Sequence, residues 1–223
     1  MPANITTLRR VPFFAPMTDA DLAQVAAVAH EHGYNRGNII ILEGERGDGL
    51  YWVNSGLIKV FKTSPEGKEQ VLRLIGPGIA FNDVPALDGG PNPASAAAME
   101  PSVVSSIGQA ELRRLILERP SVAEAVVRSL AGALRHLVTL VEDLSFRHVT
   151  ARVAKILLDQ EEAARAAGAP AHRLTQQEMA AMAGTAREMV GRALKELESS
   201  GAIELHQGRV SVLSTERLRM LLA

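Results

Sequence analysis

The sequence predicts an α+β fold that consists of an N-terminal β-roll of the jelly-roll type, one long helix and a C-terminal winged helix-turn-helix. Three observations predict this fold. Short β-rich runs separated by glycines occupy the first half of the chain, a regular heptad of apolar residues follows, and two short helices with a glycine between them lie near the C-terminus. These features divide the chain into three predicted segments, residues 1–118, 119–147 and 148–223.

The composition is that of an ordinary globular protein, with 223 residues of which 47% are hydrophobic and 22% are charged. No apolar run is long enough to span a bilayer and the N-terminus has no signal-peptide core, so we expect a cytoplasmic protein that does not contact membranes. The absence of cysteine excludes disulfides, thiol redox chemistry, iron–sulfur clusters and cysteine zinc sites. The net charge of −1 gives no general attraction to nucleic acid, so a nucleic-acid site must depend on where particular residues lie.

The first segment begins with a predicted helix over residues 18–29 and then changes character. From Tyr34 to Ile107 short β-rich runs are separated by glycines and by the turn at residues 64–67. The clearest predicted strands are Asn38–Leu42, Leu50–Val53, Leu57–Lys62 and Gln70–Ile75. A helix over Gln109–Glu118 ends the segment. Many short strands in close succession favour a sandwich or a jelly-roll barrel.

A long helix is predicted from Pro120 to about Phe146, since proline is favourable in the first turn of a helix. Six of its apolar residues follow an unbroken a/d heptad: Val127, Leu130, Leu134, Leu137, Val141 and Leu144. That pattern is typical of a two-stranded coiled coil. The alternative is a helix that buries this stripe against its own domain, but such a helix usually has a wider apolar face. We therefore predict a homodimer with these six residues in its interface.

The most specific pattern in the chain lies near its C-terminus. Thr175 followed by Glu178 has the spacing of a capping box, and Thr185 followed by Glu188 repeats it ten residues later. Two short helices that start ten residues apart, with Gly184 in the turn between them, have the spacing of a helix-turn-helix. In such a unit the second helix enters the major groove of DNA.

The second of these helices separates apolar from charged residues. Its apolar stripe, which we expect to be buried, consists of Val190, Leu194 and Leu197. The charged residues on the opposite side are Arg187, Glu188, Arg192 and Lys195. Arginine can pair with guanine through two hydrogen bonds and glutamate can accept one from cytosine, whereas the more distant lysine suits a phosphate. The alternative is a solvated helix face with i,i+4 ion pairs.

The surroundings of this helix favour DNA readout over a solvated face. A further amphipathic helix is predicted over residues 149–166, followed by a loop at Ala166–Ala171. Downstream, the alternation of apolar residues over 203–212 predicts a hairpin with a turn at His206–Gly208, in the position of a wing. Its Arg209 is placed for the DNA backbone. We add Thr175 and Thr185, at the starts of the two helices, to the predicted DNA-binding residues.

Over nearly its whole length the chain resembles the CRP/FNR superfamily, the cyclic-AMP receptor type of bacterial transcription regulator. The resemblance rests on TQQEMAAMAGTAREMVGRALKELE at residues 175–198 and on LSFRHVTAR at residues 144–152, which is similar to the family's hinge. It implies a cyclic-nucleotide-binding-like β-roll that senses a signal, a dimerisation helix and a DNA-binding domain for the three segments above.

The resemblance also implies a DNA sequence. Family members with Arg-Glu and then Arg at the positions of Arg187, Glu188 and Arg192 read TGTGA-like half-sites. We therefore expect an inverted repeat of the type TGTGA-N6-TCACA in double-stranded DNA. If the chain activates transcription, RNA polymerase is a further expected partner.

A small-molecule effector is implied as well, and here the sequence departs from the family. Cyclic-nucleotide members carry a Gly-Glu pair and then an Arg-Ser pair for the cyclic phosphate, whereas this chain has Phe81–Asn82–Asp83 and Pro93–Ala94–Ser95. Between Ile79 and Leu112 there is no Lys or Arg, so a phosphate there would depend on backbone N–H groups. Leu137 and Val138 replace the hydroxyls that cyclic-AMP receptors use against adenine. We therefore expect an effector other than cyclic AMP, in a pocket formed by Phe81, Asn82, Asp83, Ser95, Leu137 and Val138.

Two alternatives to such an effector stay open. One is a constitutive regulator, and the other is a haem-based gas sensor with His30, His32 or His136 as an axial ligand. An enzyme of the cupin kind needs histidine and carboxylate metal ligands inside the roll, but residues 34–107 contain no histidine. A kinase regulatory subunit would share the β-roll and lack the helix-turn-helix. We therefore predict a DNA-binding regulator with neither enzymatic activity nor a metal site.

Overall fold

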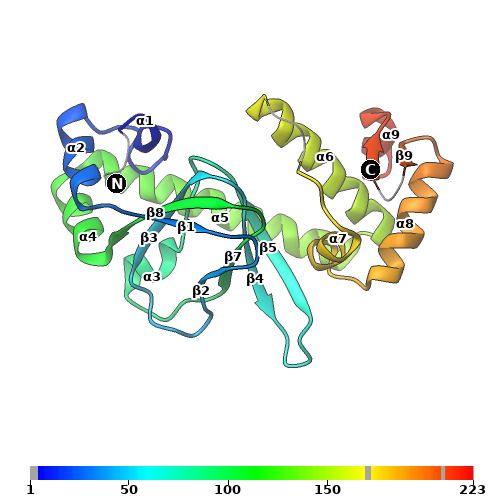
Figure 1. Cartoon of the computed structure of the whole chain (residues 1–223), viewed down its shortest axis with the longest axis horizontal. Helices are drawn as coiled ribbons and strands as arrows, with labels where there is room; N and C mark the ends of the chain where they lie inside the picture. The colour runs from blue at the N-terminus through cyan, green and yellow to red at the C-terminus, as the bar shows by residue number, and fades with distance from the viewer. Residues whose placement is uncertain (1–4, 169–171, 207–208, 223) are drawn as a thin grey trace. The chain divides into compact units, whose positions relative to one another are not determined.

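The computed structural model describes residues 5–168, 172–206 and 209–222, and it has the predicted α+β fold. The chain divides into two compact units, residues 1–62 with 71–137, and residues 63–70 with 138–223. The long helix α5 (Pro120–Phe146) contributes to both units, as can be followed in Figure 1. Because one helix belongs to both, the boundaries at 118 and 147 stay predictions. Within the described residues, no helix is both long enough and apolar enough to cross a bilayer.

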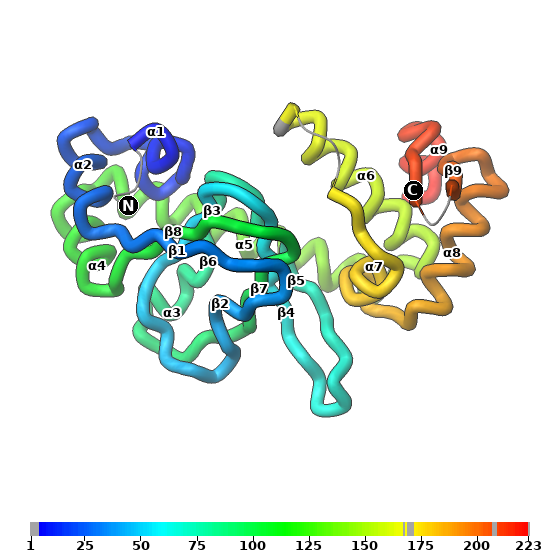
Figure 2. Tube along the Cα trace, in the orientation of Figure 1, coloured from blue at the N-terminus to red at the C-terminus, as the bar shows by residue number. Residues whose placement is uncertain are grey.

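The first unit contains two four-stranded sheets. One sheet has the strand order β1 (His30–Tyr34), β8 (Ser102–Gly108), β3 (Gly49–Ser55) and β6 (Ala80–Phe81). The other has the order β2 (Ile39–Ile41), β7 (Ser95–Ala98), β4 (Ile58–Thr63) and β5 (Glu69–Ile75). Figure 2 shows β4 and β5 as one long hairpin. The four predicted strands are present within one or two residues of their expected bounds, and the other four were not predicted.

Strand β3 packs on both of its faces, because successive side chains of a strand point to opposite sides of the sheet. Leu50 and Trp52 face a core formed with the helices of this unit, where the Trp52 ring meets Phe14 edge-on at 5.4 Å between ring centroids. Tyr51 and Val53 face the core between the two sheets. The roll therefore has a helix-covered outer face and an apolar interior.

Four further helices belong to this unit: α1 (Ile5–Leu8), α2 (Asp19–Val28), α3 (Asp83–Asp88) and α4 (Gln109–Glu118). The predicted helices at 18–29 and 109–118 are confirmed as α2 and α4, and Thr18 caps α2 by accepting the Asp21 N–H. Asn82 precedes α3 with a φ of 62°, and it stands where the family has glycine. Asparagine is among the few other residues that adopt this left-handed conformation.

The second unit is a small helical domain with a hairpin. Its elements are α6 (Val149–Ala167), α7 (Gln176–Ala183), α8 (Arg187–Ser199), β9 (Ile203–His206), β10 (Arg209–Val212) and α9 (Thr215–Met220). Its core joins all four helices through fully buried residues such as Val153, Met179, Leu194 and Leu218. Helix α6 ends at Ala167 with Gly168 as its C-cap residue, which confirms the predicted helix. Residues 169–171 of the predicted loop and residues 207–208 of the predicted turn lie outside the described residues.

Candidate nucleic-acid interface

The first helix of the predicted helix-turn-helix is fixed at both ends. At the start of α7 the capping box is complete: the Thr175 hydroxyl accepts the Glu178 N–H at 3.1 Å, and the Thr175 N–H donates to Glu178 Oε2 at 2.6 Å. At the other end Gly184 has a φ of 60°, and a Cβ added there would lie 2.6 Å from the Leu144 side chain. The left-handed conformation favours glycine at this turn, and a larger residue would also have to displace the end of the Leu144 side chain.

The second predicted capping box, Thr185 with Glu188, is wrong. Helix α8 begins at Arg187, its N-cap residue is Ala186, and no side chain caps it. Thr185 lies one residue too early, and its N–H donates to Ala180 O at the end of α7 instead. The N–H groups in the first turn of α8 therefore have no side-chain cap. They carry the positive end of the helix dipole, which suits an incoming phosphate.

Helix α8 separates its two faces completely. Its apolar stripe is buried, as predicted, with Val190, Leu194 and Leu197 at most 1% exposed. Glu188, Arg192 and Lys195 are exposed, and their spacing of four and then three residues places them on one helix face. Arg187 is exposed beside them at the helix start. Among the described residues no ion pair joins Glu188 to Arg192, so this face is not paired with itself, in contrast to the alternative of an ion-paired surface.

A partly buried network that includes Arg147 and Arg152 of the hinge sequence holds the turn after α7 in place. Arg152 Nε donates to Ala183 O at 2.7 Å, and its Nη1 donates to Arg147 O at 2.6 Å. One guanidinium thus satisfies carbonyls at the ends of α7 and α5, where helices leave unpaired acceptors. Asp143, which is buried, pairs with Arg147 and Lys155. The network ties the end of α5 to α6 and to the turn that carries α8.

The predicted wing is present as β9 and β10. The two strands pair with Arg209 opposite His206, and the Leu205 N–H donates to Glu198 Oε1 at 3.0 Å, which fastens the hairpin to α8. Arg209 is exposed. The unit therefore exposes the three elements that the sequence predicts for DNA contact: the face of α8, the start of α7 with Thr175, and the wing.

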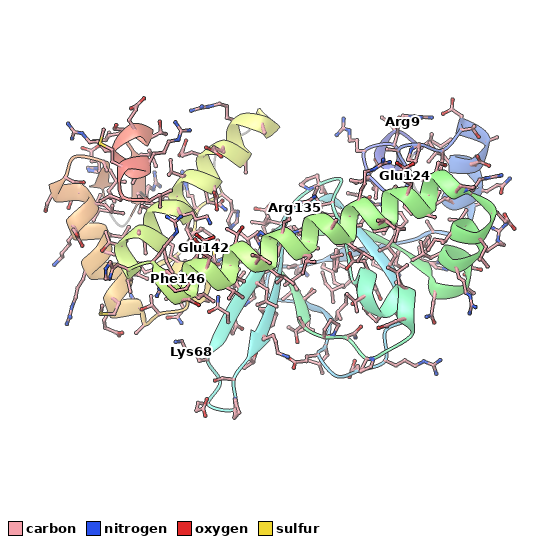
Figure 3. All side chains as sticks on the ribbon, turned by 180° about the vertical axis from the view of Figure 1, so that it is seen from behind. Arg9, Lys68, Glu124, Arg135, Glu142 and Phe146 are labelled. Atoms are coloured by element: carbon pink, nitrogen blue, oxygen red, sulfur yellow. The ribbon has the colours of Figure 1, made fainter. Side chains whose placement is uncertain are left out.

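Most of the predicted dimer stripe on α5 is uncovered in the single chain. Val127, Leu134 and Val141 are each at least 63% exposed, and Leu137 and Leu144 are also exposed. Leu130 differs, since it is half-buried against the core of its own unit. Figure 3 shows α5 from behind, with the labelled residues Glu124, Arg135, Glu142 and Phe146 spaced along it.

The structure brings together half of the predicted effector pocket. A cavity of about 100 Å³ is lined by Ile41, Val60, Phe81, Asn82, Asp83, Val84, Pro85, Pro93, Ala94 and Ala96. Phe81 is buried and stacks on Tyr51 at 5.5 Å, and burial raises the pKa of that tyrosine well above its usual value. Ser95, Leu137 and Val138 are not among the lining residues. The Ser95 hydroxyl is buried and accepts the Glu43 N–H at 3.0 Å.

Sequence reasoning missed a cation at this cavity. The segment 79–112 contains no Lys or Arg, but Lys62 from β4 contacts a lining residue of the cavity, with its Nζ 3.2 Å from Pro93 O and 2.6 Å from Glu43 Oε1. A cation from outside this segment therefore lies beside a lining residue, in addition to the backbone N–H groups that the sequence suggested. The alternation of strand residues places Lys62 on the same face as Val60, a signal that needs the strand register before it can be used.

The histidines proposed as haem ligands lie apart from this cavity. His30 and His32 are exposed on β1, and His136 Nε2 lies 2.9 Å from Leu72 O. In the described part of the chain no group of three or more His, Asp or Glu residues is placed to hold a metal ion.

Comparison with known proteins matches a family model to each of the two units. The family model for the cyclic nucleotide-binding domain matches residues 31–119, and that for the Crp-like helix-turn-helix domain matches residues 151–221. The chain is 34% identical over 215 residues to the CRP-like cAMP-activated global transcriptional regulator of Mycobacterium tuberculosis, covering 95% of this chain and 96% of that protein. It is 33% identical over 201 residues to the Cyclic AMP receptor protein of Thermus thermophilus, covering 90% and 92%. The solved structure of FixK2 from Bradyrhizobium japonicum matches with a TM-score of 0.77 at 25% identity, over 88% of this chain and 98% of that one.

Proposed function

The chain belongs to the CRP/FNR superfamily of transcription regulators, and we propose that it acts as a homodimer on an inverted repeat of TGTGA-like half-sites. Like its relatives, it is a DNA-binding regulator and not an enzyme. A cytoplasmic location accompanies this proposal, because the DNA lies there. If the protein activates transcription, RNA polymerase is its second macromolecular partner.

The exposed face of α8 carries the proposal. Arg192 and Glu188 lie one turn apart on a helix whose opposite side is fully buried, so the charged side chains are free to enter a groove without disturbing the core. We propose that Arg187 and Arg192 each bind a guanine and that Glu188 accepts a hydrogen bond from a cytosine. Lys195, Thr175, Arg209 and the uncapped start of α8, where Thr185 lies, would contact phosphates.

The inverted repeat follows from the proposed dimer. A two-fold symmetric dimer presents two copies of α8 to half-sites about one helical turn apart. The stripe on α5 supplies a surface for such a dimer, because its exposed apolar residues follow the heptad of a two-stranded coiled coil.

We further propose that the effector is not cyclic AMP. The relatives in Mycobacterium tuberculosis and Thermus thermophilus are named for cAMP, but this chain has Pro93 and Ala94 where the family's Arg-Ser pair binds the cyclic phosphate. The cavity beside them measures about 100 Å³. That is well below the roughly 300–1,000 Å³ of most ligand pockets. The alternative is a constitutive regulator with no effector.

Fluorescence anisotropy with labelled duplexes tests the proposal. We expect binding to TGTGA-N6-TCACA to exceed binding to a scrambled duplex by about 10³-fold or more at physiological salt, and cyclic AMP to leave both affinities unchanged. Equal binding to the two duplexes would refute the half-site. A saturable increase in operator affinity with cyclic AMP would refute the proposed effector class and leave the half-site intact.

A further inference from the structure

An ion pair between Lys62 and Glu43 lies beside a residue that lines the cavity in the β-roll. Residues Val60 and Lys62 share one face of β4, and Val60 lies opposite Ala96 of β7, which also lines the cavity. Lys62 therefore follows the lining face outward to the strand end, where its Nζ lies 3.2 Å from the carbonyl oxygen of the lining residue Pro93. Glu43 meets it from the other side, two residues beyond the lining residue Ile41.

We propose that Lys62 is the anion-binding residue of this cavity and that the effector is a small organic monoanion with a short apolar body. The inference rests on the proposed function in one respect, namely that the β-roll houses an effector. Lys62 would replace the missing arginine of the 93–95 segment, with the cation coming from a neighbouring strand instead of from that segment.

Exchange of Glu43 for a ligand anion is easy on energetic grounds. The Lys62 and Glu43 side chains are 50% and 36% exposed, and ion pairs at such exposure contribute little because water screens them. A released Glu43 carboxylate returns to solvent. The ammonium is meanwhile held at the cavity by the Pro93 carbonyl, so a ligand carboxylate finds the donor already in position.

The surrounding charges and the lining define the ligand class. Asp83 lines the cavity and Glu43 pairs with Lys62, so carboxylates outnumber the ammonium here and disfavour a ligand that carries two negative charges. The rest of the lining is apolar apart from Asn82. A cavity of about 100 Å³ accepts a short aliphatic group and not a nucleoside. The Lys62 ammonium, the apolar lining and the small volume together favour a short-chain carboxylate over a phosphate dianion, and butylamine tests the opposite charge.

Nuclear magnetic resonance titration of the full-length protein without DNA tests the proposal, with sodium butyrate, methyl phosphate and butylamine as probes. We expect butyrate to shift the amide signals of residues 41–43 and 94–96 saturably. Lys62→Met should weaken that binding about tenfold or more, the loss expected for a charge-assisted hydrogen bond. Glu43→Gln should strengthen it about two- to fivefold, because a competing exposed carboxylate is removed.

Lys59→Met is the matched control. Lys59 is on the same strand but faces away from the lining residues, and its ammonium lies 4.3 Å from the Phe61 ring centroid. This variant should keep the wild-type butyrate affinity. Equal losses in Lys59→Met and Lys62→Met, no saturable shift in the wild type, or stronger binding of butylamine than of butyrate would each overturn the proposal. Tighter binding of methyl phosphate would overturn the choice of a carboxylate monoanion.

This experiment is independent of operator recognition. Anisotropy with the TGTGA duplex, measured on the same variants, reports the DNA interface of the second unit alone. A failure of Lys62 to bind anions would leave operator binding unchanged, and a failure of operator binding would leave the butyrate titration interpretable.

Discussion

Helices α5 and α8 are both amphipathic, but α8 exposes its charged face whereas α5 exposes much of its apolar face. Helix α8 buries Val190, Leu194 and Leu197 to within 1% and exposes charged residues. Helix α5 buries Val122 and Val126 near its start but leaves Leu134 and Val141 each 63% exposed. What a helix leaves uncovered indicates what it can bind: a polar polyanion for α8, and an apolar surface such as a second copy of itself for α5.

The largest expected effect comes from a charge on the exposed stripe of α5. Leu134→Glu should dissociate the proposed dimer, because an unpaired charge at a seam position of a coiled coil costs several kcal/mol. Analytical ultracentrifugation at micromolar concentration should show a dimer for the wild type and a monomer for the variant. Thr139→Glu, which places the same charge outside the heptad, should remain dimeric. A monomeric wild type would contradict the claim that the exposed stripe of α5 binds a second copy of the chain.

Loss of a base contact on α8 should have the next largest effect. Arg192→Ala should cost about 1–3 kcal/mol per half-site and relax the preference at one base pair only. Binding-site selection followed by sequencing checks this change in preference. An equal loss of affinity for matched and mismatched operators would show that this face of α8 does not read bases.

Lys195→Ala is predicted to differ from Arg192→Ala in kind. Since Lys195 lies on the same face but further from the helix start, its loss should weaken binding to all sequences alike. The slope of log affinity against log salt should become shallower by about one per subunit. Anisotropy titrations at several salt concentrations measure it. A change in base preference with an unaltered slope would assign Lys195 to base readout instead.

The smallest expected effects are on helix stability, and they should differ between Thr175→Ala and Thr185→Ala. Thr175→Ala should destabilise α7 by about 1 kcal/mol, because it removes a complete capping box. Thr185→Ala should leave the stability of α8 nearly unchanged, because its hydroxyl caps nothing. Native-state hydrogen exchange at the amides of α7 and α8 measures both. Comparable losses of stability in the two variants would show that Thr185 also caps a helix.

The sequence was most informative where local rules decide the structure. Helices α4 and α5 begin and end at the predicted residues, since periodicity and the proline at 120 define them. The heptad residues of α5 are exposed in the single chain except Leu130, which packs against the core of its own unit, and their role in a dimer stays a prediction. The error at Thr185 arose because a shift of one residue in the helix start changes the capping residue, and the spacing of Thr and Glu cannot fix that start.

The cavity was harder to predict because it depends on strand pairing. β7 has the sequence SAAA, which lacks the β-branched and aromatic residues that indicate a strand, and of its residues Ala96 lines the cavity. Lys62 and Pro93 are 31 residues apart and meet only through the pairing of β4 with β7. A count of charges along one segment could not find that contact.

The spacing between half-sites tests the central claim most directly, since it requires α5 and α8 to act together. Wild-type affinity should be measured by anisotropy for TGTGA-N6-TCACA and for the same repeat with five additional base pairs between the half-sites. If α5 joins two copies of α8 at a fixed separation, the insertion turns one half-site to the opposite side of the duplex. Affinity should then fall to that of a single half-site. Equal affinity for the two spacings would contradict a dimer that reads DNA as one unit.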